Sequence, residues 1–178
     1  MTAVPKPTRN KKAKKPKKSS ITDYKKLCDE LWRVCIHVRD KNRCQYTLLT
    51  TGQNTLGSDA HHIFTRDAFA TRWTVDNGIL LKAMHNVSDA HVRPEKFKRT
   101  LIKKSWFTQE EFDHLYQESE KIVHYKQPDY EIIKNNLIAQ LNLLLKSDPG
   151  YVPLVRDRME RWLKKWPITQ EEKAMIFV

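Results

Sequence analysis

Four of the chain's seven histidines lie close together, within one stretch that ends at Pro94. They are His61, His62, His85 and His91. A neutral imidazole binds divalent metal ions, and an imidazole nitrogen can also take up a proton near neutral pH. If a hairpin carries the first two histidines and a following helix carries the later ones, a metal ion and a general base could meet at one phosphate group. The chemistry that this pattern favours is hydrolysis of a phosphodiester.

Two short strands and a helix must position these side chains. The segment Thr55–Thr65 is expected to form the first strand and Ile79–Leu81 the second. Asn77-Gly78 just before the second strand favours a tight turn with positive φ. A helix is expected to begin at His85 and to run to about Ala90. Pro94 ends this segment, because proline disfavours helix in the residue before it.

Helices are expected to dominate the rest of the chain. A capping residue at Ser20 or Thr22 opens a helix to about Asp40, with apolar residues every three or four positions. Similar patterns predict helices over Glu95–Lys104, Thr108–Tyr125, Asp129–Lys146 and Arg156–Lys165, whereas Lys41–Gln53 reads as a strand and turn. The predicted fold class is α+β and mostly helical, with a short antiparallel hairpin plus helix inserted among packed helices.

The chain is strongly basic. Its 178 residues suit one domain plus extensions and carry a net charge of +12, so the first partner to consider is a polyanion. Residues 1–20 carry +8 of that charge and no acid, and they are expected to form a disordered arm. The arm could follow DNA phosphates, or serve only as a solubilising tail or a nuclear-localisation-like signal. The lysines assigned to nucleic-acid contact are Lys11, Lys12, Lys14, Lys15, Lys17 and Lys18.

The cysteines and the hydropathy indicate a protein of a reducing compartment. Cys28, Cys35 and Cys44 are an odd number without a CxxC pair, so they predict no disulfide framework. Cys28 and Cys35 are expected to be small core residues. No apolar run approaches the ~20 residues that cross a bilayer, and the basic N-terminus lacks the apolar segment of a secretory signal. We expect a cytoplasmic protein without membrane contact.

The string AHHIFTRDAFATRWTVDNGILL, residues 60–81, carries the order His-His, Asn, and further histidines follow it. In this it resembles the HNH (His-Me finger, ββα-metal) endonucleases, in particular bacteriophage members that act in recombination or genome processing. The resemblance covers about residues 36–97. It implies a ββα-metal finger, DNA as the substrate, one divalent metal ion (Mg, Mn, Zn or Ni) and, for a phage protein, the host cytoplasm. The domains would be a basic arm (1–20), an HNH core with a leading helix (21–97) and a C-terminal helical region (98–178).

The resemblance also implies roles for individual residues. His62 would be the general base, and Asn77 would orient it. The metal ligands would be His61, His85 and His91.

Three further residues are assigned on general chemical grounds. Asp59 is expected to accept a hydrogen bond that fixes the tautomer of a histidine. Arg66 and Arg72 are expected to contact phosphates, with a merely solvated surface as the alternative.

The chain departs from the family pattern in the register of its histidines. Side chains of adjacent strand residues point to opposite faces, so His61 and His62 can serve one site only if the strand twists or bends. Many relatives have a histidine nine residues after the asparagine, where this chain has Asn86. His85 and His91 are six residues apart, or ~600° around an α-helix, and so would not share a face.

Many HNH relatives also hold a structural zinc ion with two CxxC pairs. This chain keeps only Cys44 of the first pair, with Thr47 at the partner position, and Lys82 and His85 stand in the region of the second. We therefore expect no four-cysteine zinc site.

Two other functions remain open from the sequence. The chain could be a non-catalytic nucleic-acid-binding protein with a degenerate HNH finger, or a small helical scaffold in a phage assembly. Whether it forms a homodimer is also open.

Overall fold

The computed structural model describes residues 20–151, and the helices within this range surround one small hairpin. The predicted basic arm, except for Ser20, and the predicted helix over 156–165 lie outside the described residues. The first element, α1 (Ile21–Arg39), begins with a capping box in which Ser20 and Asp23 bond to each other's backbone N–H groups. This confirms the helix predicted from Ser20. None of the described helices is long and apolar enough to cross a membrane.

The segment predicted as a strand and turn is instead a helix, α2 (Gln45–Thr51). The aromatic and β-branched residues of this segment favour a strand, but local capping favours a helix. Gly52 ends the helix in the left-handed conformation, with φ of 72°, and its N–H bonds to Leu48. Cys44, at the N-cap, is buried and accepts a hydrogen bond from the Thr47 hydroxyl.

The sheet consists of β1 (Asp59–His62) and β2 (Gly78–Leu81), which pair antiparallel. The first strand is shorter than predicted. A 3-10 turn, η1 (Val75–Asn77), leads into β2. The predicted positive φ after Asn77 is wrong, because Gly78 is extended with φ of −123°.

All the elements described after the hairpin are helical. They are α3 (Ala83–His85), a π-helical turn η2 (Asn86–His91), α4 (Pro94–Lys103), α5 (Gln109–Ser119), α6 (Gln127–Ser147) and a short 3-10 turn η3 (Pro149–Tyr151). The helix predicted from Thr108 is present and begins with a capping box between Thr108 and Glu111, but α5 ends at Ser119 and not near Tyr125. The predicted domain boundary between residues 97 and 98 falls inside α4.

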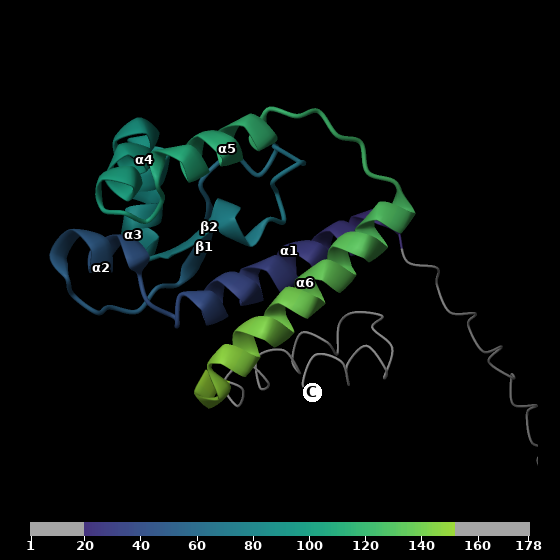
Figure 1. Cartoon of the computed structure of the whole chain (residues 1–178), viewed down its shortest axis with the longest axis horizontal. Helices are drawn as coiled ribbons and strands as arrows, with labels where there is room; N and C mark the ends of the chain where they lie inside the picture. Colours follow the sequence, from purple (N-terminus) through teal and green to yellow (C-terminus); the bar gives the residue numbers. More distant parts are fainter. Residues whose placement is uncertain (1–19, 152–178) are drawn as a thin grey trace, which may run out of the picture.

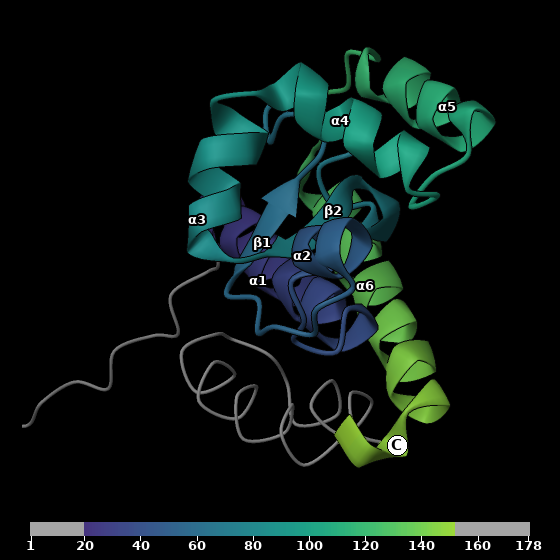
Figure 2. The same cartoon turned by 90° about the vertical axis from the view of Figure 1, so that its left-hand side faces the viewer.

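The hairpin lies between two helical layers (Figures 1 and 2). On one side α1 and α6 run parallel to each other, and Cys28 and Cys35 of α1 contact the carbonyls of Tyr130 and Leu137 on α6. On the other side lie α4 and α5. Both cysteines are buried as predicted, and burial raises the pKa of each thiol to about 12.

Strand β2 joins the two hydrophobic cores. Leu80 packs into the core formed by α1 and α6, whereas Ile79 and Leu81 pack into the core formed with α4 and α5. This division follows from the alternation of side chains along a strand. The helix α1 is so close to β2 that a Cβ on Gly78 would lie 2.3 Å from Cδ1 of Ile36 and 2.7 Å from Trp32.

The close approach of α1 to Gly78 predicts a stability effect. Gly78→Ala should lower the free energy of unfolding by about 1–3 kcal/mol, because the added methyl group overpacks the contact. Urea denaturation measures this. The control is Gly150→Ala, where the nearest atom to the new Cβ is 3.6 Å away. Equal stabilities of the two variants would contradict the packing described.

Candidate active site

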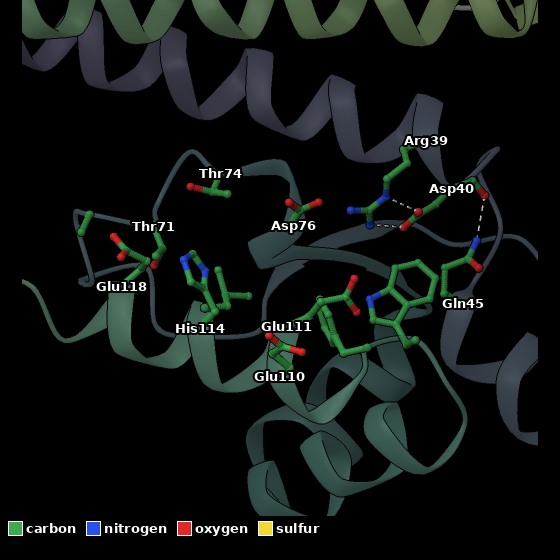
Figure 3. A pocket seen from close by; sticks show the side chains of 14 residues that line it. Arg39, Asp40, Gln45, Thr71, Thr74, Asp76, Glu110, Glu111, His114 and Glu118 are labelled. Atoms are coloured by element: carbon green, nitrogen blue, oxygen red, sulfur yellow. Dashed lines mark hydrogen bonds and ion pairs between the residues drawn. The ribbon is translucent and has the colours of Figure 1, made fainter.

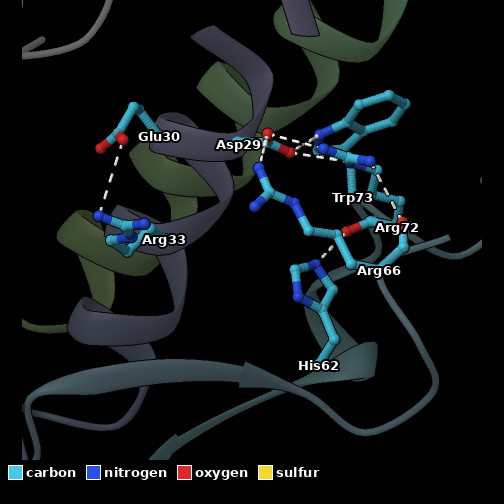
Figure 4. A network of polar contacts seen from close by, with 7 residues as sticks. All are labelled: Asp29, Glu30, Arg33, His62, Arg66, Arg72 and Trp73. Carbon is cyan, nitrogen blue, oxygen red and sulfur yellow. Dashed lines mark hydrogen bonds and ion pairs between the residues drawn. The ribbon is translucent and has the colours of Figure 1, made fainter. Parts of the chain in front are cut away.

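The ring of His62 is held on two sides. It stacks on Trp32 of α1, with ring centroids 3.8 Å apart, and its Nε2 lies 2.9 Å from the carbonyl oxygen of Arg72 (Figure 4). Because a carbonyl only accepts, Nε2 carries the proton and Nδ1 carries the lone pair. Burial lowers the pKa of His62 to about 4. The ring is therefore neutral at pH 7, the form in which Nδ1 can accept a proton.

The carboxylate of Asp29 fixes the loop that supplies this carbonyl. Asp29 lies on α1 and is only 9% exposed. It accepts two hydrogen bonds from Arg72, at 2.8 and 2.9 Å, one from Nε1 of Trp73 at 2.9 Å and one from Arg66 (Figure 4). These contacts tie the loop between the strands to α1, and they set the position of the carbonyl to which His62 donates.

The two arginines therefore differ from their predicted role. Arg72 is 9% exposed, and its guanidinium is committed to Asp29, so the predicted phosphate contact is corrected to a structural ion pair. The side chain of Arg66 is 56% exposed and uses one nitrogen for Asp29. A guanidinium has five N–H donors, so Arg66 retains donors that a phosphate could use.

Asn77 fixes the same loop from the other end. It is fully buried, and its Oδ1 accepts from the N–H of Phe64 at 2.8 Å. Its Nδ2 donates to the carbonyls of Phe64 and Thr71 at 3.2 and 3.1 Å. Because Thr71 precedes Arg72, Asn77 acts on His62 through the backbone. The Asn77 side chain is buried and bonds to groups of the loop. We therefore regard Asn77 as a positioning residue.

His61 faces the opposite helical layer. Its ring meets the edge of His91 at a centroid distance of 5.1 Å and that of Phe97 at 5.7 Å. Burial, and after it the charge of His91, lowers the pKa of His61 to about 4. The side chain of Asn86 also lies against His61. His61 is thus neutral at pH 7 and able to ligate a metal ion.

A π-helical turn brings Asn86 and His91 together. In η2 the N–H of Val92 bonds to the carbonyl of Val87, five residues earlier, at 3.2 Å. A π-turn aligns residues five apart, whereas an α-helix turns by ~100° per residue and separates them. Both Asn86 and His91 consequently face His61.

Asp59 completes this group, although not as predicted. Its carboxylate accepts from Nδ2 of Asn86 at 3.3 Å and not from a histidine. The Oδ1 atom of Asn86 is buried and makes no hydrogen bond of ordinary geometry within residues 20–151. We call His61, Asn86, His91 and Asp59 the histidine–asparagine group.

His85 stands apart from this group. Its Nδ1 lies 2.8 Å from Oδ2 of Asp89, and its ring packs on Tyr46. Within residues 20–151 no three histidine, cysteine, aspartate or glutamate side chains are gathered closely enough to hold a metal ion. The predicted ligand set of His61, His85 and His91 is therefore not assembled. Only His61 and His91 are adjacent.

The side chains of His61 and His62 alternate between the two faces of the hairpin, as expected for adjacent residues of a strand. His62 faces α1 and His61 faces α4, on opposite sides of the hairpin. The two rings are still close enough for the charge of His62 to lower the pKa of His61. Within the described range, β1 pairs only with β2, so its other edge has no strand partner, and we call it the free edge of β1.

A cavity of about 890 Å³ lies elsewhere, between α5 and the loop before β2 (Figure 3). None of the predicted catalytic or metal-binding residues lines it. Its charged lining includes Asp76, Glu110, Glu111 and Glu118. Asp40 is a fifth carboxylate in this lining, against the single guanidinium of Arg39, and this excess of negative charge makes the cavity unsuitable for a phosphate.

Sequence reasoning missed Trp32 and Asp29, which position His62. A signal for them exists in α1. Asp29, Trp32, Ile36 and Arg39 recur at steps of three and four, and so they form a second face beside the apolar stripe that packs on α6. The nitrogens of Arg39 donate to the carbonyls of Val75 and Gly78. This second face of α1 contacts the hairpin and its loop.

Comparison of the chain with protein-family models, with curated proteins and with solved structures found no match.

The Asp29 contacts predict a pH-dependent loss of stability. Burial raises the pKa of Asp29, but the hydrogen bonds from Arg72 and Arg66 outweigh it and bring the pKa below the ordinary value of 3.8. The stabilisation is complete above that value and is lost as the pH falls through the lower folded pKa. Asp29→Asn should therefore cost about 3 kcal/mol at pH 7, and the difference from wild type should shrink at strongly acidic pH.

Urea denaturation at several pH values checks this expectation. The control is Glu30→Gln on the same helix. Glu30 pairs with Arg33 at 3.6 Å on the surface, and such pairs contribute at most about 1 kcal/mol. A difference between Asp29→Asn and wild type that does not change with pH would contradict the buried ion pair.

Proposed function

We propose that the protein is a metal-dependent endonuclease of the HNH kind, which hydrolyses phosphodiester bonds of DNA. In this proposal the hairpin with α3 and η2 is the ββα-metal finger. The observation that carries it is that β1 holds a neutral, oriented His62 on one face and His61 of the histidine–asparagine group on the other. A base and a candidate ligand set thus flank the same strand edge.

His62 would be the general base. Its Nε2 is occupied by the Arg72 carbonyl, so Nδ1 is the atom that would take the proton from the attacking water. Stacking on Trp32 and the hydrogen bond to Arg72 limit rotation of the ring. A fixed ring orientation favours proton transfer from one defined direction.

The histidine–asparagine group would hold a single divalent cation after its side chains move closer together, because within residues 20–151 no three histidine, cysteine, aspartate or glutamate side chains are near enough to hold one as they stand. It offers the neutral imidazole of His61, the imidazole of His91, the Oδ1 atom of Asn86 and the neighbouring Asp59 carboxylate. A mixed set of nitrogen and oxygen ligands suits Zn, Ni or Mn, whereas Mg binds through the oxygen ligands. When bound, such an ion relieves charge on the phosphate oxygens and on the leaving oxygen.

The free edge of β1 is where the substrate would lie. A phosphodiester along this edge has His62 on one side and the histidine–asparagine group on the other. Arg66, with its exposed guanidinium, stands on the His62 side. The net charge of +12 favours DNA as the source of the phosphodiester.

A plasmid-nicking assay tests the base. His62→Ala should slow nicking of supercoiled DNA by at least about 100-fold, because the proton acceptor is lost, whereas DNA binding and the circular dichroism spectrum should change little. The matched control is His124→Ala, since His124 is exposed and distant in sequence from the hairpin. Wild-type nicking by His62→Ala would contradict the assignment.

The same assay separates the endonuclease from the non-catalytic DNA-binding protein that the sequence left open. Nicking by the wild type that needs Mg²⁺, Mn²⁺, Ni²⁺ or Zn²⁺ and stops on chelation supports an endonuclease. Salt-dependent DNA binding without nicking in any of these metals would favour the non-catalytic DNA-binding protein.

Metal binding can be tested without activity. Ni²⁺ or Zn²⁺ at about 100 times its dissociation constant should stabilise the wild type by about 2.7 kcal/mol, seen as a rise of several degrees in Tm. His61→Ala should lose this rise. His85→Ala should keep it, because His85 is held by Asp89 and lies outside the group. Loss of the rise in His85→Ala alone would contradict the ligand set.

A further inference from the structure

We propose that the exposed face of α4 is the surface along which the phosphate backbone of a DNA duplex lies as it approaches the strand edge. This inference rests on the proposed function and adds to it a binding surface outside the basic arm.

The helix α4 and its two flanking residues are strongly basic. They carry one acid, Glu95, and six basic residues, which are Arg93, Lys96, Lys98, Arg99, Lys103 and Lys104. Lys98 lies over the ring of Phe64, 5.0 Å from its centroid, and it pairs with Glu95 at 3.6 Å. The other five basic residues are exposed, and within residues 20–151 they form no salt bridge of 4.0 Å or less.

Three of these residues form a continuous row. Lys96, Arg99 and Lys103 are separated by three and four positions, so they lie on one face of the helix. The row is about 10 Å long at 1.5 Å per residue. Duplex DNA carries one charge per about 1.7 Å of its axis, so a row of this length can meet several phosphates.

The opposite face of α4 is anchored to the candidate site. Phe97 and Leu101 are buried, and Phe97 contacts the rings of His61 and Tyr46, at 5.7 and 5.3 Å between centroids. His91 ends the segment directly before α4. Figure 2 shows α4 crossing above the hairpin. The basic row is therefore fixed relative to the histidine–asparagine group.

Charge is segregated between neighbouring helices. In α5 there are four acids and no lysine or arginine, and the cavity beside it is lined by carboxylates (Figure 3). An ordinary solvated surface intersperses both signs. Here α5 repels a polyanion and α4 attracts it, so the backbone of a bound duplex should lie over α4.

The test measures the affinity for a short labelled duplex in the presence of chelator, at several salt concentrations, for full-length protein. In the test variant Lys96, Arg99 and Lys103 are each changed to Gln. The control variant changes Lys26, Lys41 and Lys146 to Gln, which removes the same charge from the α1 and α6 layer. All six side chains are exposed, so both variants should fold.

The α4 variant should bind at least about tenfold more weakly than the control variant, and the slope of log affinity against log salt should fall by about 2–3, because each lost phosphate contact removes about 0.9. The loss should be equal on duplexes of different sequence.

Equal affinities of the two variants would overturn the α4 surface. If the wild type nicks plasmid while the variants bind alike, only the α4 surface fails; if the wild type neither binds nor nicks, the proposed function fails with it.

Discussion

One buried carboxylate organises the part of the molecule where chemistry is proposed. Asp29 accepts hydrogen bonds from two guanidiniums and an indole of the loop between the strands. A lone buried charge is costly, and it is tolerated here because Arg72 and Arg66 compensate it. Through Arg72 the same contacts determine where His62 finds its acceptor. The loop has little regular structure of its own, so its shape depends on this carboxylate.

A second constraint comes from the thinness of the sheet. Two strands of four residues cannot form a stable sheet alone, and β2 compensates by burying residues in both cores. Gly78 permits α1 to approach, and Asn77 closes the loop from within. Strand β1 is half-buried along its length, and within the described residues its free edge pairs with no strand. Strand β2 thus supplies the buried contacts, and β1 carries the two histidines of the proposed site.

The sequence predicts the long helices well, because α1, α4 and α6 have apolar stripes, caps or an initial proline. It fails at α2, where a glycine cap and burial of Tyr46 override the strand preference of the residues. It also fails at η2. Patterns at 3.6 residues per turn could not reveal that a π-turn would align Asn86 with His91.

The ion pair of Arg72 could not be predicted from the sequence either, because its partner Asp29 is 43 residues away. Charge alone cannot distinguish an arginine that binds phosphate from one that binds a buried acid. The same holds for Asn77, whose place in the motif is visible but whose partners, Phe64 and Thr71, are known only from the fold.

The parallel pairing of α1 with α6 has a consequence for biosynthesis. Partner residues such as Cys35 and Leu137 are 102 positions apart. At about 5–20 residues per second, a ribosome needs on the order of 5–20 s to make the intervening chain. During that interval the apolar side of α1 has no partner helix. The nascent protein therefore cannot acquire its final tertiary structure until translation has passed α6, which delays maturation and favours chaperone contact with the exposed helix.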